Sequence, residues 1–445
     1  MPATVPPDPR PGTAGHPRRI VTIAGALLLS VAAACTEEIE TTAVCADAPE
    51  LCPEQRFEVE QVVLNPVVLD TSLTGVPLLG NEPYLGLVRH GGTVDTRPVY
   101  RFDELPQKYR VGSGSDSAAI TQVIEPVVQL VIDRRESDFD APVTIEAFDV
   151  THAGSDTSSA EILPLFTDAR RLGTLAAVPR PSTDTITFDT LRVPLDPAVL
   201  LDRITTGERL RIGLRLAASD QGSLLLTHGA TIRFDVSTDT AIAPVVVGTR
   251  SETPTDDPVL RSDLRSYLVV ADGSPTPAGS VLSVGGFPNR RSFLRFEIPT
   301  DQVPADASVL RATLVLTQRP VSGFAPTDTF LVRALPLTAS SVVTDLDQLV
   351  RLAANPRDPQ GGEIPITAPM KLVPGDSGQR EMAIANLVTL WSARSGVDIQ
   401  PAIVLAVQFE GASPLRAEFF SSEAAAELRP QLRVSFVRRV NFDIP

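Results

Sequence analysis

Short stretches in which apolar and polar residues alternate recur through most of this chain. "VLRATLVLTQ" (309–318) and "TIRFDV" (231–236) are two of them, and "VTIEAFDV", "RLRIGLRLA" and "AIVLAVQF" have the length of single strands. A period of two places alternate side chains on opposite faces of a β-sheet. The 40 prolines are typical of turns and sheet edges, because proline has no backbone N–H to donate. The pattern therefore predicts an all-β protein.

Only three stretches have the spacing of short amphipathic helices. Residues 383–396 place one apolar row on a single helical face, made of Ile384, Leu387, Val388 and Trp391. Residues 196–208 have a similar row before Gly207, made of Leu200, Leu201 and Ile204. A third helix is expected within 343–356, begun by Thr344 or Asp345. Few helices among many strands favour jelly-roll-like β-sandwiches, in which a short helix closes one end.

The chain contains an internal repeat. "SFLRFEIP" (292–299) echoes "VYRFDELP" (99–106), and a shift of about 194 residues places Arg101 on Arg295 and Phe102 on Phe296. "ATIRFDV" (230–236) falls on "PQLRVSFV" (430–437) at a slightly larger shift. We therefore expect two tandem β-sandwich domains, over residues 57–246 and 247–440. Alternation predicts Leu294, Phe296 and Ile298 in the core, and it predicts the arginine and the acid on the solvent face.

The first 34 residues have the parts of a secretory signal peptide. Arg18 and Arg19 precede an apolar run over 20–29, and mostly small residues lead to Cys35. This end resembles a bacterial lipobox, although Ala32 stands where such boxes usually carry leucine. The resemblance implies cleavage before Cys35 and lipid on its thiol; the alternative is an ordinary signal peptide with an incidental cysteine. Thr36 follows Cys35 where an inner-membrane retention signal would have aspartate, which favours the outer membrane.

Residues 35–56 are acidic, polar and rich in turn formers, so we interpret them as a flexible tether. They hold the two other cysteines, Cys45 and Cys52. Two thiols in an exported protein usually form a disulfide. Metal binding is the alternative; no second cysteine pair accompanies them, and the next histidine is His90.

No catalytic or metal-binding motif stands out. The formal net charge is −15, which argues against nucleic-acid binding. The histidines are too scattered for a metal site, and no "GxSxG" elbow is present, so we expect no catalytic residues, no metal and no cofactor. Calcium is a minor possibility, because the loops 112–117 and 253–258 offer hard oxygen ligands.

Aromatic residues make up 5% of the chain, which weakens sugar binding through flat rings. We expect Trp391 to pack in the core, because it lies on the apolar face of its helix. Tyr84, Tyr100 and Tyr267 are the more open candidates for contact with a polysaccharide. The ligand-binding residues are otherwise unknown at this stage.

Four features follow one another along residues 280–437. They are "SFLRFEIP" followed by "VPADASVLRATLVLTQ", the helix "IANLVTLWSARSG", the strand "AIVLAVQFEG" and the closing segment "FFSSEAAAELRPQLRVSF". In this order and spacing they resemble the DNRLRE-type domain, a β-sandwich module of bacterial and archaeal surface proteins. The first unit lacks the tryptophan and the closing motif. The resemblance implies an extracellular, non-catalytic sandwich, and some relatives bind polysaccharides. It identifies no ligand residue in this chain.

We therefore expect a non-catalytic lipoprotein that is anchored to the cell envelope through Cys35 and contacts other envelope proteins. The alternative is a surface protein that binds polysaccharide. A hydrolase is a distant third possibility. An apolar patch or an open edge strand would favour the first, and exposed coplanar tyrosines the second.

Overall fold

The computed structural model confirms an all-β protein. It describes residues 59–75, 84–90, 94–111, 116–139, 141–153, 159–178, 187–250, 264–273, 280–337, 367–392 and 401–438, with a few positions between 343 and 353. The signal peptide (1–34), the tether (35–56), and with them Cys35, Cys45 and Cys52 lie outside the described residues. So do the loop 253–258, most of the loop 112–117, and both Thr344 and Asp345. No helix in the described part of the chain is long and apolar enough to span a membrane.

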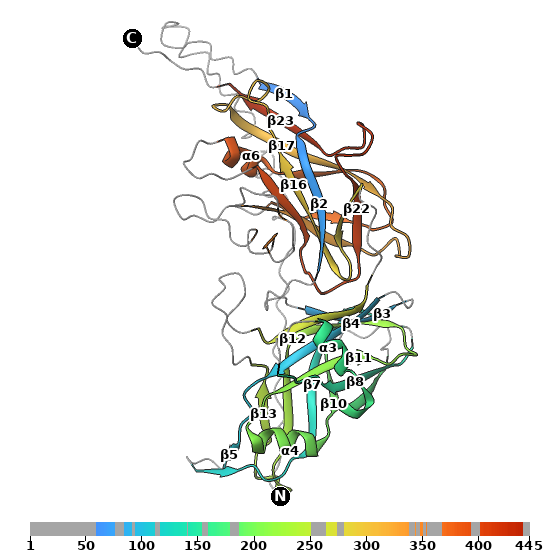
Figure 1. The fold of residues 1–445 in the computed structure, drawn as a ribbon, viewed down its shortest axis with the longest axis vertical. Helices are drawn as coiled ribbons and strands as arrows, with labels where there is room; N and C mark the ends of the chain where they lie inside the picture. Colours follow the sequence, from blue (N-terminus) through green and yellow to red (C-terminus); the bar gives the residue numbers. More distant parts are fainter. Residues whose placement is uncertain are drawn as a thin grey trace, which may run out of the picture. The chain divides into compact units, whose positions relative to one another are not determined.

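One ten-stranded antiparallel sheet, which we call the N-terminal sheet, forms the first half of the fold (Figure 1). Its hydrogen-bonded order is β10 (Phe188–Pro194), β7 (Ile124–Asp138), β12 (Gly222–Asp235), β3 (Tyr84–His90), β4 (Val94–Phe102), β11 (Leu210–Leu216), β8 (Val143–Asp149) and β9 (Arg171–Ala177). β13 (Val245–Gly248) joins β12, and β14 (Ser266–Asp272) joins β4. A separate hairpin is made by β5 (Lys108–Arg110) and β6 (Ser117–Ala119).

The N-terminal sheet curls until its two end strands, β9 and β10, meet. Register shifts in the pairing of β7 with β12 mark the places where the long strands bend. The curl encloses one apolar core, to which Phe102, Ile132 and Phe234 contribute fully buried side chains. Where β9 meets β10, a β-carbon on Gly173 would lie 2.0 Å from the carbonyl oxygen of Pro194. Glycine is therefore required for this close approach.

Replacing Gly173 with alanine is expected to destabilise the N-terminal sheet. The new methyl group would collide with main chain, which cannot move aside as a flexible side chain can, so we expect at least the usual overpacking cost of about 1–3 kcal/mol. The measurement is the midpoint of chemical denaturation. Gly229→Ala is the matched control, because no atom outside its two chain neighbours lies within 4 Å of its added methyl group. Equal midpoints for the two variants would contradict the close approach.

Two facing sheets form the second half, which we call the C-terminal sandwich. The first sheet has the order β1 (Val59–Leu64), β23 (Gln431–Val437), β17 (Ser308–Arg319), β22 (Arg416–Phe420) and β15 (Val281–Gly285), with β20 (Gly378–Ala383) also paired to β17. The second has the order β19 (Met370–Leu372), β18 (Phe330–Pro336), β21 (Ala402–Val407), β16 (Asn289–Phe296) and β2 (Val67–Gly75).

The core of the C-terminal sandwich matches the sequence prediction. Leu294 and Phe296 are buried between the sheets, and Ile298 packs against the same cluster. Helix α6 (Ala385–Ser392) places Leu387 and Val388 in this core. Trp391 is partly buried there, and its ring stacks on Phe296 with centroids 5.3 Å apart. The prediction that Trp391 packs in the core is confirmed.

The other helices close the N-terminal sheet. α4 (Pro197–Thr206) begins at Asp196, whose carboxylate accepts from the amide of Ala198, and ends at Gly207 in the left-handed conformation. It buries Leu200 and Ile204, as its spacing predicts. The short segments α3 (Ser159–Ile162), η2 (Leu163–Leu165) and η3 (Asp168–Arg170) lie over the opposite face of the sheet from the core, where a second apolar cluster includes Phe148, Ile162 and Phe166.

Strand pairing does not follow the predicted boundary between residues 246 and 247. β1 and β2 lie in the predicted first domain, yet they pair with β23 and β16 of the C-terminal sandwich. Figure 1 shows these two blue strands among the orange and red ones. Conversely, β14 lies in the predicted second domain and pairs with β4 of the N-terminal sheet. The C-terminal sandwich is therefore built from two separate stretches of sequence, and the strands of the N-terminal sheet, from β3 to β14, lie between them in the chain.

Candidate functional site

A group of buried charges lies where β4, β11 and β8 run side by side. The register places Arg211 of β11 opposite Arg101 of β4. The Nε atom of Arg101 donates to the Asp103 carboxylate at 3.0 Å, and Nε of Arg211 donates to the other Asp103 oxygen at 3.4 Å. All three side chains are at most 4% exposed. Arg101 and Asp103 were predicted on the solvent face; that prediction is wrong.

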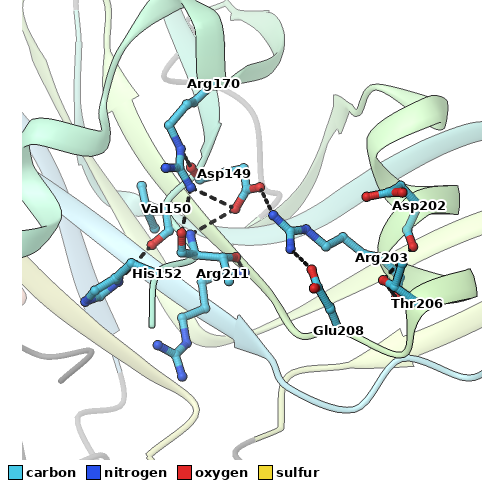
Figure 2. A network of polar contacts seen from close by, with 10 residues as sticks. Asp149, Val150, His152, Arg170, Asp202, Arg203, Thr206, Glu208 and Arg211 are labelled. Carbon is cyan, nitrogen blue, oxygen red and sulfur yellow. Dashed lines mark hydrogen bonds and ion pairs between the residues drawn. The ribbon is translucent and has the colours of Figure 1, made fainter. Parts of the chain in front are cut away.

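Asp149, at the end of β8, is the centre of a second polar network next to the first (Figure 2). Its carboxylate accepts from Nη2 of Arg203 at 3.0 Å and from the backbone amide of Thr151 at 2.9 Å. Arg170 donates to the carbonyl oxygens of Asp149 and Thr151, each at 2.6 Å. The two networks meet at Arg211, whose backbone amide donates to the Thr151 hydroxyl at 2.8 Å.

The tertiary fold assembles the Asp149 network from four separate elements. Arg170 is the last residue of η3, and Arg203 lies in the last turn of α4. Burial alone would lower the pKa of Arg203, but the carboxylates of Asp149 and Glu208 together raise it above its usual value. A guanidinium held in this way stays charged and fixes the end of α4 against β8.

His152 lies at the edge of the same network. One ring nitrogen is 3.3 Å from the carbonyl oxygen of Val150, and the other is 3.4 Å from a carboxylate oxygen of Glu161. Its backbone carbonyl accepts from Arg209 at 2.7 Å. Both ring nitrogens therefore have a partner in the chain. Since Glu161 belongs to α3, the second contact holds α3 against the end of β8.

The ion pairs of Asp103 and Asp149 limit the chemistry that these two carboxylates can perform. Asp103 and Asp149 each accept from arginine, so both carboxylates are acceptors in charge-assisted hydrogen bonds. A general base or metal ligand would need to release those partners. Within the described residues, no group of three or more His, Cys, Asp or Glu side chains could hold a metal ion. The geometry supports a structural role, in which buried ion pairs fix the strand ends.

The C-terminal sandwich has a buried ion pair of its own. Arg291 of β16 donates from Nε to Glu410 at 2.6 Å, and a second contact joins its Nη2 to the other carboxylate oxygen. Nearby, burial and the charge of Arg416 lower the pKa of Arg290 to about 10, although Glu418 opposes the change. By contrast, Arg295 and Glu297, the counterparts of Arg101 and Asp103 in the repeat, are not buried. The repeated arginine and acid therefore lie in different surroundings in the two halves.

Two of the three tyrosines proposed for polysaccharide contact lie in the interior. Tyr100 is fully buried, and its hydroxyl donates to the carbonyl oxygen of Thr227 at 2.8 Å; burial raises the pKa of this phenol above its usual value. Tyr267 is buried in the apolar cluster beneath α3. Tyr84 is partly exposed and meets the ring of Phe409 edge-on, with centroids 6.3 Å apart. Tyr100 and Tyr267 thus cannot present flat faces to a sugar.

Sequence reasoning missed most of the buried charges. Arg211, Asp149 and Arg203 belong to no motif. Asp149 ends β8 and Arg203 lies in the last turn of α4, and their partners are distant in sequence. One signal was present: "RLRIGLRLA" (209–217) sets arginines at alternate positions of an otherwise apolar strand. Such a strand has a polar face, and carboxylates on neighbouring strands are the natural partners for it.

Comparison with known proteins adds little to this description. No protein-family model and no curated protein matches the chain. Among solved structures, it is similar to a crystal structure of a protein assigned as secreted from Parabacteroides distasonis, with a TM-score of 0.21 and 11% identity. That match covers 84% of this chain and 99% of the other. A TM-score this low does not define a common fold.

Proposed function

We propose that this chain is a non-catalytic lipoprotein of the bacterial envelope, anchored through Cys35, which acts as a structural or interaction module. The observation that supports it is that the buried carboxylates are paired with arginines of the same chain. Asp103, Asp149 and Glu410 are buried against arginines that fix strands and helix α4 in place, and these arginines occupy the carboxylates that a substrate would otherwise meet. The outer membrane as the site of anchoring and the resemblance of residues 280–437 to the DNRLRE-type domain remain predictions.

An open sheet edge also supports an interaction role. β1 is one of the two end strands of its sheet among the described residues, and Val59 and Val63 on it are half-exposed or more. Unpaired backbone groups and exposed valines on an edge strand favour contact with another chain.

Replacing Cys35 with serine is expected to move the protein from the membrane to the soluble fraction. The lipid attached to Cys35 would supply the membrane affinity, since acyl chains gain about 0.8 kcal/mol for each buried methylene group. The measurement is fractionation of cells that express the full chain, followed by immunoblotting. Cys45→Ser is the control and should leave the protein in the membrane. Membrane retention of the Cys35→Ser variant would contradict lipid anchoring at this residue.

Polysaccharide binding is the less favoured function, because Tyr100 and Tyr267 are buried. A glycan array probed with the exported protein tests it directly. Saturable binding to one polymer, lost on replacing Tyr84 with alanine, would reverse this ranking.

A further inference from the structure

The edge formed by β1 lacks three of the features that usually prevent strands from pairing with other chains, and its one charged residue, Glu60, is already paired with Arg438 of its own chain. Its six residues pair with β23 in an unbroken register, with no bulge. The sequence "VEQVVL" contains no proline and no lysine. Natural edge strands are commonly protected by one of these devices, because the outward N–H and C=O groups can otherwise accept a further strand. β1 has none of them within the described chain.

The side chains of β1 separate cleanly into two rows. Val62 and Leu64 face the core of the C-terminal sandwich, whereas Val59, Gln61 and Val63 are exposed on the outer face. The exposed fractions of Val59 and Val63 are 50% and 60%. A strand added to this edge would therefore find two valines with a polar residue midway between them.

The outer row is complementary to itself. When β1 is paired antiparallel with another β1 so that Gln61 faces Gln61, Val59 of each copy lies opposite Val63 of the other. Glu60 then lies opposite the uncharged Val62, and it already has an ion pair with Arg438 of its own chain. β-branched pairs directly opposite each other are favourable in antiparallel sheets, whereas like charges are unfavourable.

The two neighbouring symmetric registers place less favourable pairs of side chains opposite each other. Moving the two-fold axis to Glu60 would set two carboxylates directly opposite each other. Moving it to Val62 would set each exposed Val63 opposite a polar Gln61. The register centred on Gln61 therefore pairs valine with valine and keeps the acids apart.

We propose that β1 pairs antiparallel with β1 of a second copy of this chain, with Gln61 on the two-fold axis. The two β1-containing sheets then become one continuous sheet, and each copy presents the same surface to the other. This inference rests on the proposed function as an interaction module and names its partner.

The proposed pairing is compatible with anchoring of both copies in one membrane. The two Val59 residues would lie about 14 Å apart along the paired strands, at roughly 3.4 Å for each residue. Cys35 precedes Val59 by 24 residues, and an extended chain of that length reaches up to roughly 80 Å. Both lipids can therefore reach the same bilayer.

The test is co-purification of two differently tagged full chains that are co-expressed and extracted in mild detergent. Wild-type copies are expected to co-purify. Gln61→Lys in both copies, or Gln61→Glu in both, places like charges on the axis and should reduce recovery about two- to fivefold. One copy with each substitution should restore it, because opposite charges then meet. Val246→Lys, a control at an exposed position on β13, should change nothing.

Three outcomes would overturn the proposal. The first is that wild-type copies do not co-purify, and the second is that the doubly Gln61→Lys pair is recovered like wild type. The third is that a photo-crosslinker at position 61 captures a different protein or another segment of the same chain. Membrane fractionation of the same cells reports separately on Cys35. Protein that remains in the membrane without co-purifying disproves the pairing alone, and released protein that still co-purifies disproves the anchor alone.

Discussion

A fragment spanning residues 280–438 is expected not to fold by itself, and addition of residues 59–75 is expected to restore the fold. The reason is that β1 and β2 are the outermost strands of the two sheets of the C-terminal sandwich. Without them, β23 and β16 would each expose a row of backbone groups, which favours aggregation.

The missing segment also removes apolar side chains from the core. Leu64 is buried there, and four more residues pack against the same clusters, namely Val62, Val67, Leu69 and Leu73. Full burial of such a side chain contributes about 1.5–3 kcal/mol. Loss of several of them is comparable with the whole stability of a domain, about 5–15 kcal/mol. We therefore expect loss of folding and not merely a lower midpoint.

The experiment compares the fragment alone with the same fragment carrying residues 59–75 on a flexible linker. Size-exclusion chromatography and circular dichroism report compactness and strand content. A linked segment with Leu64→Asp and Leu69→Asp is the matched control and should fail to restore the fold. A cooperative unfolding transition for the unlinked fragment, at the midpoint of the linked one, would show that β1 and β2 are dispensable.

Replacing Asp103 with asparagine is expected to be the most damaging single isosteric change in the N-terminal sheet. It removes a carboxylate that accepts from both Arg101 and Arg211 in the protein interior. Breaking a buried ion pair from one side typically costs about 3–5 kcal/mol, because the remaining charge is no longer compensated. For a unit of this size we expect the melting temperature to fall by roughly 6–20 °C.

Two further variants separate charge from packing. Asp168→Asn removes a carboxylate that is 80% exposed and paired with Arg171, so its effect should stay within about 0.5 kcal/mol. Arg211→Met added to Asp103→Asn removes one uncompensated cation and should recover part of the lost stability. If the double variant is no more stable than Asp103→Asn, the loss of stability comes from altered packing and not from the uncompensated charge.

Local patterns predicted the parts of the fold that depend on neighbouring residues. Alternation identified Leu294 and Phe296 as core residues, and helical spacing identified the buried faces of α4 and α6. These predictions succeeded because the period of a strand or helix is fixed by its backbone geometry. The same alternation placed Arg101 correctly on the face opposite Phe102. It could not show that this face is also covered, because alternation carries no information about what packs on a surface.

The sequence by itself determined the class of the protein, its few helices and the apolar rows that form its cores, since these follow from side-chain periodicity along the chain. Only the tertiary structure decided that β1 and β2 complete a sandwich whose other strands begin more than 200 residues later, and that Asp103 and Asp149 are buried among arginines. The physical reason is that strand pairing and buried charge pairing are contacts between distant segments. Their energies depend on three-dimensional proximity, which no short stretch of sequence specifies.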